Sequence, residues 1–296
     1  MNILITGAKG QLGRSLQDIL ACPEYQSRYR VAAHDIDTLD LRNADRLHEV
    51  FSEFAPDVVI NAAAYTAVDK AESDSDAAWE LNSNVVTSLV AECRQSGARL
   101  IQISTDFVFN GRKSSPYLPE DDCDPLNVYG KSKRQAEETL LASPDCNGLI
   151  IRTAWLYSPY GNNFVKTMLR LMTERNELGV VCDQVGTPTS ATTLAGVVVR
   201  AMELPELSGV YHWTDAGVAS WYDFAVAIRE EAVAAGLLSG NTRIQPIGSR
   251  QYPTPAKRPS FSVLDKSATC EQFSVTPHHW REALRDVLQT LRLNRG

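Results

Sequence analysis

The sequence lacks any long apolar run that could cross a membrane. Its first hydrophobic stretch, Ile3-Leu4-Ile5, ends within two residues of a glycine, and no later run approaches the roughly 18 to 20 apolar residues that span a bilayer. It also lacks the basic segment followed by an apolar one that marks a secretory signal peptide. We therefore expect a soluble, cytoplasmic protein with no membrane partner.

Paired cysteines and basic clusters are absent as well. The six cysteines show no C-x-x-C spacing, which argues against a disulfide framework and against a zinc site. The net charge is −7, and no stretch of the chain is densely basic. We therefore expect free structural thiols and no nucleic-acid partner.

The length and the hydrophobic pattern indicate an α/β protein. At 296 residues the chain suits one large domain or two joined domains. Up to about residue 155, short apolar segments alternate with helical ones, which predicts a Rossmann-type doubly wound parallel sheet covered by helices. The expected strands are 2–6, 30–34, 58–61, 100–104 and 149–152, and the expected helices lie near 11–21, 43–54, 76–96 and 126–142. We assign residues 1–155 to a dinucleotide-binding domain and residues 156–296 mainly to a smaller α/β substrate domain, with some later segments packing back onto the first.

A glycine-rich turn joins the first expected strand to the first expected helix. Gly7, Gly10 and Gly13 recur at every third position. Gly7 would allow a sharp turn, Gly10 a close approach of the backbone to phosphates, and Gly13 close packing of the helix on the sheet. Because the turn lies between a strand and a helix, it predicts a pyrophosphate site, although a merely tight connection would show the same residues.

The ends of the next two strands supply further candidates for cofactor binding. Asp35 follows the second strand, where a carboxylate can bind ribose hydroxyls and repel a 2′-phosphate. Lys9 would tolerate that phosphate, so we expect either NADPH or NADH. The complete set expected to bind the dinucleotide is Gly7, Gly10, Gln11, Leu12, Gly13, Asp35, Asp40, Leu41, Ala62, Ala63, Ala64, Tyr129 and Lys133. Asp35 could equally be a solvated loop acid, and the alanines could begin a packed helix.

A hydroxyl-bearing strand end and a Tyr-x-x-x-Lys pair suggest the chemistry. Ser104 and Thr105 end the fourth strand, and Tyr129 and Lys133 are four residues apart in the helix that follows. They would therefore share a helical face and point into the cleft beside Thr105. A neighbouring ammonium would lower the pKa of the phenol from about 10. Each feature alone is compatible with chance, but together with the glycine turn they indicate an active site.

Longer segments resemble a known family. They are the glycine turn at 7–13, 61–72, Ser-Thr-Asp-Phe-Val-Phe at 104–109, 127–133, Arg-Thr-Ala-Trp-Leu-Tyr at 152–157, 161–168 and Pro-Thr-Pro-Ala-Lys-Arg-Pro at 253–259. Over nearly its whole length the chain resembles the dTDP-4-dehydrorhamnose reductases, within the extended branch of the short-chain dehydrogenase/reductase superfamily.

The resemblance implies the reduction of the C4 ketone of a dTDP-4-keto-6-deoxy-L-sugar by NAD(P)H, giving dTDP-L-rhamnose. It implies that Tyr129 donates the proton, that Lys133 holds the nicotinamide ribose, and that Thr105 binds the reacting oxygen. The residues expected to bind the nucleotide-sugar substrate are Thr105, Asp106, Phe107, Tyr129, Trp155, Asn163, Lys166 and Arg258. Trp155 could instead be a core residue, and Lys166 and Arg258 could belong to a solvated charged face.

The resemblance also implies a homodimer with a magnesium ion held by acidic side chains at its contact. Ser15 and Thr192 stand where those carboxylates are expected, and neither is a hard-cation ligand on its own. We therefore expect no metal in the catalytic site, and the dimer stays an open expectation.

Two other functions remain as alternatives. One is another nucleotide-sugar ketoreductase or an epimerase with the same fold. A 4,6-dehydratase is disfavoured, because it would need a second acid after Asp106, and Phe107 occupies that position. The other is a regulatory subunit that binds a dinucleotide without chemistry, which would have no use for a proton donor such as Tyr129.

Overall fold

A computed structural model describes residues 1–294 of the chain. Its centre is a six-stranded sheet in which every pair of neighbouring strands is parallel. The strands, in their spatial order, are β10 (Gly209–His212), β5 (Leu149–Thr153), β4 (Arg99–Thr105), β3 (Val58–Asn61), β1 (Asn2–Thr6) and β2 (Arg30–His34). The chain reverses its direction of progress between β1 and β3, so a ligand-binding crevice is expected beyond the carboxyl ends of these strands.

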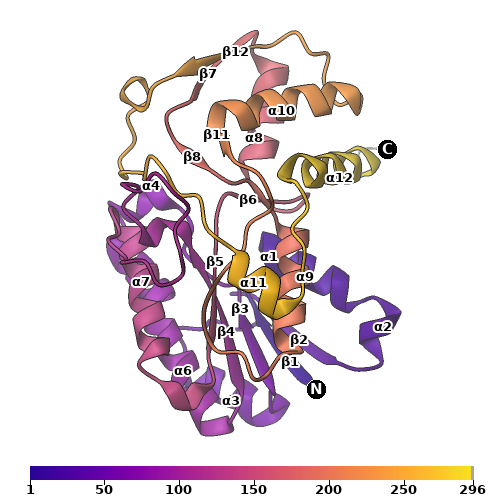
Figure 1. Ribbon diagram of the computed structural model, residues 1–296. Helices are drawn as coiled ribbons and strands as arrows, with labels where there is room; N and C mark the ends of the chain where they lie inside the picture. The colour runs from indigo at the N-terminus through magenta and orange to yellow at the C-terminus, as the bar shows by residue number, and fades with distance from the viewer. Residues whose placement is uncertain (295–296) are drawn as a thin grey trace.

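Helices cover both faces of this sheet, which confirms the predicted Rossmann-type doubly wound architecture (Figure 1). On one face lie α1 (Gln11–Leu20), α2 (Pro23–Gln26), α9 (Ala191–Met202) and α11 (Ser267–Phe273). On the other lie α3 (Ala44–Phe54), α6 (Val85–Ser96) and α7 (Val128–Leu141). Strand β1 is buried on both sides, because Ile3 and Ile5 pack against one helical layer while Leu4 packs against the other.

The helix expected over 76–96 is interrupted by a wider turn. It begins as α5 (Ser75–Trp79), passes through a π-helical turn at Glu80–Asn84, and continues as α6. Asn82, within this turn, bonds both the backbone of Tyr65 and the Ser132 hydroxyl on α7. A short helix, α4 (Val68–Ala71), precedes α5.

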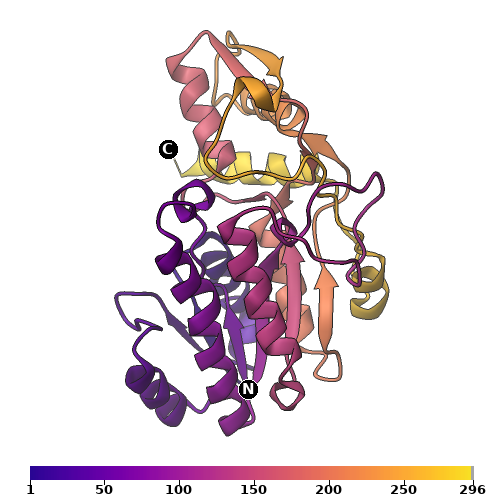
Figure 2. The same ribbon diagram turned by 90° about the vertical axis from the view of Figure 1, so that its left-hand side faces the viewer.

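The second half of the chain forms a smaller α/β lobe beside the carboxyl ends of the strands (Figures 1 and 2). Its helices are α8 (Phe164–Glu174), α10 (Trp221–Ala234) and α12 (Trp280–Leu293). Its strands pair as β7 (Glu177–Val181) with β12 (Arg243–Ile247), β6 (Leu156–Tyr157) with β9 (Thr189–Ser190), and β8 (Val185–Gly186) with β11 (Ala219–Ser220). Phe224, Ile228 and Leu284 form the centre of its own hydrophobic core.

Several later segments belong to the first core. Helix α9 packs against α1, strand β10 is the edge strand beside β5, and Phe273 of α11 is buried in the same cluster. We therefore keep the division near residue 155 as a proposal in which these three elements return to the dinucleotide-binding domain. No helix among residues 1–294 combines the length and the apolar character needed to span a bilayer.

Candidate active site

Two connected cavities lie along the carboxyl ends of the central strands. One, of about 490 Å³, is lined by residues that follow β1, β2 and β3. The other, of about 590 Å³, is lined by residues that follow β1, β3, β4 and β5. Gly10 and the alanines 62–64 line both. An elongated ligand can therefore lie across the switch point of the sheet, with its middle at the glycine turn.

The three glycines each solve a different steric problem. Gly7 has φ +69°, and a Cβ there would stand 2.7 Å from the Ala63 amide nitrogen. A Cβ on Gly13 would collide with the Gly7 carbonyl oxygen, so Gly13 permits α1 to pack on the turn itself rather than on the sheet. A Cβ on Gly10 would meet only that same oxygen, at 3.1 Å, and would otherwise project toward the cavities that Gly10 lines.

The N-terminus of α1 faces these cavities with unused donors. Gly10 occupies the N-cap position and offers no side chain to the helix. Within residues 1–294, the backbone N–H groups of Gln11 and Leu12 have no hydrogen-bond acceptor. Free N–H groups at a helix N-terminus form a site for a phosphate, so this turn fits the pyrophosphate of a dinucleotide.

The first cavity presents charges of both signs. Asp35 accepts a hydrogen bond from the Lys9 backbone N–H at 2.8 Å, while the Lys9 ammonium pairs with Asp37 at 2.6 Å. Asp40 and Arg42, also in its wall, form their own ion pair at 2.7 Å. Each of these two cations already has an anionic partner, whereas the Asp35 and Glu80 carboxylates in the same wall have no ion-pair partner among the described residues, so the wall as it stands does not favour an additional phosphate.

Thr105, Tyr129 and Lys133 line the second cavity together. Thr105 ends β4, and its hydroxyl accepts a hydrogen bond from the Phe107 N–H at 3.2 Å. Helix α7 begins at the Asn127 cap, and its Gly130 lies so close to Phe107 that a Cβ would collide with the Phe107 carbonyl oxygen. This contact brings the start of α7, and with it Tyr129, against the end of β4.

The pKa of Tyr129 differs from the expectation. Burial raises the pKa of its phenol to about 12, with the Thr105 hydroxyl acting in the opposite direction. The expected lowering of this pKa by Lys133 was wrong for this structure, because burial of the phenol dominates the shift. The Lys133 ammonium donates a 2.6 Å hydrogen bond to the Ile103 carbonyl oxygen. Tyr129 is therefore protonated at neutral pH, the state that a proton donor requires.

Lys133 is itself perturbed by its surroundings. Burial lowers the pKa of its ammonium to about 8, and the nearby Glu137 carboxylate acts in the opposite direction. Its bond to Ile103 uses one of three N–H donors, which leaves others for ligand oxygens.

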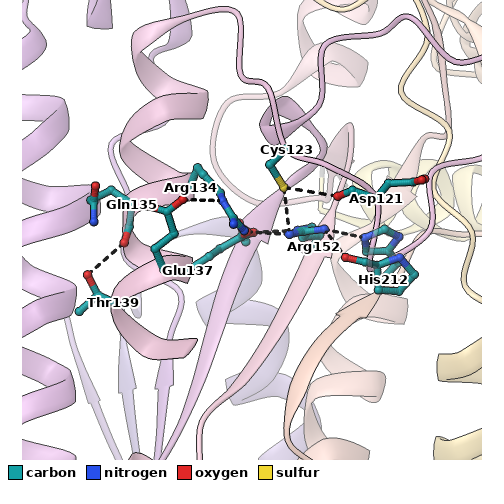
Figure 3. Close-up of polar contacts among 11 residues, drawn as sticks. Asp121, Cys123, Arg134, Gln135, Glu137, Thr139, Arg152 and His212 are labelled. Carbon is teal, nitrogen blue, oxygen red and sulfur yellow. Dashed lines mark hydrogen bonds and ion pairs between the residues drawn. The ribbon is translucent and has the colours of Figure 1, made fainter. Parts of the chain in front are cut away.

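Beneath these residues lies a buried ionic cluster (Figure 3). Glu137, one turn beyond Lys133, accepts hydrogen bonds from Arg152 of β5, from Ser104 and from Arg134. Burial alone would raise the pKa of Glu137, but these partners hold it below its usual range. Arg152 also contacts His212 of β10 at 3.3 Å. The cluster thereby joins α7 to three strands of the sheet.

Trp155 forms a wall of the second cavity on the side of the smaller lobe. Its ring stacks on Trp221 at 3.6 Å between centroids, and its backbone has φ +48°. A Cβ on Gly186 would stand 2.7 Å from the Trp155 ring, so this ring is held between α10 and β8. A left-handed backbone at a bulky residue is uncommon and is found most often at functional sites.

The remaining expected residues divide into those inside and outside the two cavities. Asp40, Leu41, Asp106 and Phe107 line them. Asn163 also lines the second cavity, but its amide caps α8 and donates to the Gln11 side chain at 2.9 Å, which ties the two lobes together.

Three expected residues lie outside both cavities. Gly13 packs within the turn, and Lys166 donates to the Pro159 carbonyl oxygen at 3.3 Å. Arg258 is paired with Asp69 of α4 at 2.7 Å. Contact of Lys166 or Arg258 with a substrate diphosphate stays a prediction, and for Arg258 it would require this ion pair to rearrange.

Sequence reasoning did not assign several residues of the site. His34, Ile36 and Arg42 line the first cavity, and Thr66, Val68 and Thr153 line the second. His34 and Thr153 end β2 and β5, and Ile36 and Thr66 follow soon after β2 and β3, so an inspection of the residues at and just beyond each strand end would have found these four. Trp221 gave no such signal, because its contact with Trp155 depends on how the smaller lobe folds.

Metal ligands do not gather in the described part of the chain. Among residues 1–294 no group of three or more His, Cys, Asp or Glu side chains is arranged to hold an ion. Ser15 is buried in α1 and donates to the Gln11 carbonyl oxygen, whereas Thr192 is exposed at the start of α9. The absence of a metal requirement stays a prediction.

Comparisons with known proteins agree on one family. The family model described as RmlD substrate binding domain matches residues 1–293. A dTDP-4-dehydrorhamnose reductase of Aggregatibacter actinomycetemcomitans is 43% identical over 291 residues, covering 96% of this chain and 97% of that protein.

Two solved structures resemble the whole chain. A dTDP-4-dehydrorhamnose reductase of Clostridium acetobutylicum has a TM-score of 0.91 and 40% identity, covering 99% of this chain and all of the other, 100%. One from Bacillus anthracis, in complex with NADP, has a TM-score of 0.88 and 33% identity, covering 97% and 98%. With its sequence and its fold in agreement, the chain belongs to the RmlD substrate binding domain family.

Proposed function

We propose that this protein is an NAD(P)H-dependent oxidoreductase that reduces the C4 ketone of dTDP-4-dehydro-6-deoxy-L-mannose to give dTDP-L-rhamnose. The observation that carries the proposal is the placement of Thr105, Tyr129 and Lys133 in one cavity that continues into the glycine turn. The names of the full-length relatives point to the same reaction.

The residues present fit a dinucleotide. Gly10 leaves space beside the free N–H groups of Gln11 and Leu12 for the pyrophosphate, and Asp35 lies in the wall where the adenosine ribose would bind. A bound NADPH or NADH supplies the hydride that adds to C4 of the ketone. Its nicotinamide end would enter the second cavity, beside Tyr129 and Lys133.

Tyr129 is the group best suited to donate the proton. Its phenol is protonated at neutral pH because burial raises its pKa to about 12, and it lies beside Thr105 in the same wall. As negative charge develops on the C4 oxygen, hydrogen bonds from Tyr129 and Thr105 stabilise it, and the Tyr129 proton then passes to that oxygen. The Lys133 ammonium can hold ribose hydroxyls with the N–H donors that its bond to Ile103 leaves free.

The substrate would occupy the part of the second cavity nearest the smaller lobe. Trp155 offers an aromatic wall for the sugar ring, and Phe107 and Val68 line the same cavity. Its nucleotide diphosphate would extend toward the smaller lobe, in the direction of Asn163, whose side chain marks the limit of the cavity there.

The alternative functions fit the site less well. The acid after Thr105 is followed by Phe107, so a dehydratase's second acid has no counterpart. A regulatory subunit would not need a protonated phenol beside a buried ammonium. A homodimer remains part of the proposal on the family resemblance, and a cytoplasmic location remains part of it as the expectation from the sequence pattern.

The test is to supply the purified protein with NADPH or NADH and either dTDP-4-dehydro-6-deoxy-L-mannose or its GDP counterpart. The proposal expects stoichiometric oxidation of the reduced cofactor with the dTDP sugar, and NMR of the product should show the rhamno configuration at C4. Binding of the cofactor without oxidation would favour the regulatory subunit. Retention of a tightly bound NAD through turnover would favour an epimerase.

A further inference from the structure

Asp106 is a buried acid whose surroundings do not suit a charged carboxylate. Its side chain is only 2% exposed and lines the second cavity directly after Thr105. One carboxyl oxygen, Oδ1, lies 3.1 Å from the Thr105 hydroxyl oxygen. The other, Oδ2, is buried and has no hydrogen-bond partner within residues 1–294. An unpartnered buried oxygen is far costlier on a carboxylate than on a neutral acid.

The contact between Asp106 and Thr105 decides what the threonine can do. A hydroxyl has one hydrogen to donate and two lone pairs. One lone pair of Thr105 already accepts from the Phe107 N–H at 3.2 Å. If Asp106 is a carboxylate, Thr105 must donate its only hydrogen to Oδ1, and none is left for the reacting oxygen of a substrate. If Asp106 carries a proton on Oδ1, that proton fills the second lone pair of Thr105 and frees the threonine hydrogen.

We propose that Asp106 is a positioning residue that must be protonated for Thr105 to donate its hydrogen to the substrate's C4 oxygen. This inference rests on the proposed ketone reduction and adds to it a requirement on the state of a second residue. No proton leaves Asp106 during the reaction, since Tyr129 remains the donor. Asp106 acts only by setting the direction of one hydrogen bond.

The charges around Asp106 agree with this assignment. Burial raises its pKa to about 6, and the hydroxyls of Ser262 and Thr105 together with the backbone N–H groups of Asp106 and Phe107 act in the opposite direction. The titratable group facing it from α7 is Tyr129, whose phenol is neutral. From the C-terminal segment it meets Ser262, which carries no charge. Lys133 is engaged with the Ile103 carbonyl oxygen instead. Within the described residues no cation pairs with Asp106, and a bound substrate would exclude water and favour its neutral form further.

The pH dependence of kcat/KM tests the inference. Between pH 5 and pH 7 the protonated fraction of a group with a pKa of about 6 falls about tenfold. The wild-type protein should therefore lose about tenfold in kcat/KM for the keto sugar over this range. This range lies below the pKa of Lys133, which is about 8. Asp106→Asn, which cannot titrate, should vary by less than about twofold.

A second variant separates this role from a purely electrostatic one. Thr105→Val removes the hydroxyl through which Asp106 is proposed to act, so its lower kcat/KM should no longer fall between pH 5 and pH 7. A charge on Asp106 that acted directly on Tyr129 or on the substrate would leave the tenfold fall in place in Thr105→Val. That persistence would overturn the inference.

An NMR titration of the wild-type protein tests the inference without turnover, so it does not depend on the activity of a variant. In the wild-type protein labelled with ¹³C at aspartate carboxyls, the Asp106 signal should titrate near pH 6, identified by its absence from the Asp106→Asn spectrum. A signal that titrates near pH 4 would overturn the inference. If the wild-type protein turns over the keto sugar but kcat/KM does not change between pH 5 and pH 7, only the inference about Asp106 is overturned. If there is no turnover at any pH, the proposed function is overturned as well.

Discussion

The Glu137 carboxylate accepts two hydrogen bonds, of 2.9 and 2.8 Å, from the Arg152 guanidinium, and both side chains are buried (Figure 3). Glu137 lies two turns after Tyr129 on α7, and its partner Ser104 immediately precedes Thr105 on β4. The pair therefore sets the position of the helix that carries Tyr129 against the strand that carries Thr105.

Breaking this pair from one side should destabilise the fold. Arg152→Met would leave the buried Glu137 carboxylate without its main partner, and losing one member of a buried pair costs about 3–5 kcal/mol. The measurement is the free energy of unfolding in urea at pH 7. The double variant Arg152→Met with Glu137→Leu removes both charges and should recover much of that loss.

An exposed pair provides the matched control. Arg170 and Glu174 are one turn apart on α8, and their side chains are 61% and 50% exposed. Arg170→Met should change the free energy of unfolding by less than about 0.5 kcal/mol. If Arg152→Met were as mild as Arg170→Met, the buried pair would not have the structural role described.

Two glycines of the turn should respond differently to alanine. The Cβ added by Gly10→Ala would contact only the Gly7 carbonyl oxygen, at 3.1 Å. The melting temperature of this variant should therefore stay within a few degrees of the wild type. Its Cβ would occupy space next to the free N–H groups, so the Kd for NADPH should rise at least about tenfold.

Gly13→Ala places a Cβ against the Gly7 backbone and should lower the melting temperature or prevent folding. Calorimetry and fluorescence titration with NADPH distinguish the two substitutions. Equal loss of stability in both would contradict the assignment of Gly10 to the phosphate site.

Cofactor preference should depend on Asp37. The Lys9 ammonium pairs with Asp37 at 2.6 Å on an exposed surface, and Asp37→Asn would free it for a 2′-phosphate. The ratio of kcat/KM for NADPH to that for NADH should rise about two- to fivefold, as expected for an exposed charge contact. Asp45→Asn, on the exposed start of α3, should leave the ratio unchanged.

The rate should fall at alkaline pH as Lys133 loses its proton. Burial lowers the pKa of its ammonium to about 8, so the charged form is present below this pH and is lost as pH rises through it. The profile of kcat/KM should decline above pH 8. In Lys133→Arg the fall caused by Asp106 should persist, but the additional decline that sets in near pH 8 should be absent, because a guanidinium stays charged, whereas Lys131→Arg should keep the wild-type profile.

Most of the first domain followed from local pattern. The strands that end at Thr6, His34 and Asn61 have the predicted bounds, because fully buried parallel strands leave short apolar runs between helical segments. The apolar run at 210–212 predicts strand β10, but its place beside β5 did not follow, because the pairing of Val210 with Ile150 joins residues 60 positions apart. Strands β7 and β12 were missed for the same reason, and Pro246 within β12 argued against a strand.

The site was predictable where residues follow strand ends and less so elsewhere. The four-residue spacing of Tyr129 and Lys133 predicted that they share a face beside Thr105, and the structure places all three in one cavity, where β4 and α7 are held together at Phe107 and Gly130. The direction of the pKa shift of Tyr129 was not predictable, because it depends on how deeply α7 packs. The Arg258 ion pair with Asp69 joins residues 189 positions apart, and no local sequence pattern predicts it.

The most direct test of the account is the rate of hydride transfer in Tyr129→Phe, followed by stopped-flow oxidation of NADPH with dTDP-4-dehydro-6-deoxy-L-mannose. Loss of a positioned donor to the developing oxyanion should slow this step about 10²- to 10³-fold, while the Kd for NADPH stays within about twofold of the wild type. A transfer rate within about twofold of the wild type would contradict the assignment of Tyr129 as the proton donor.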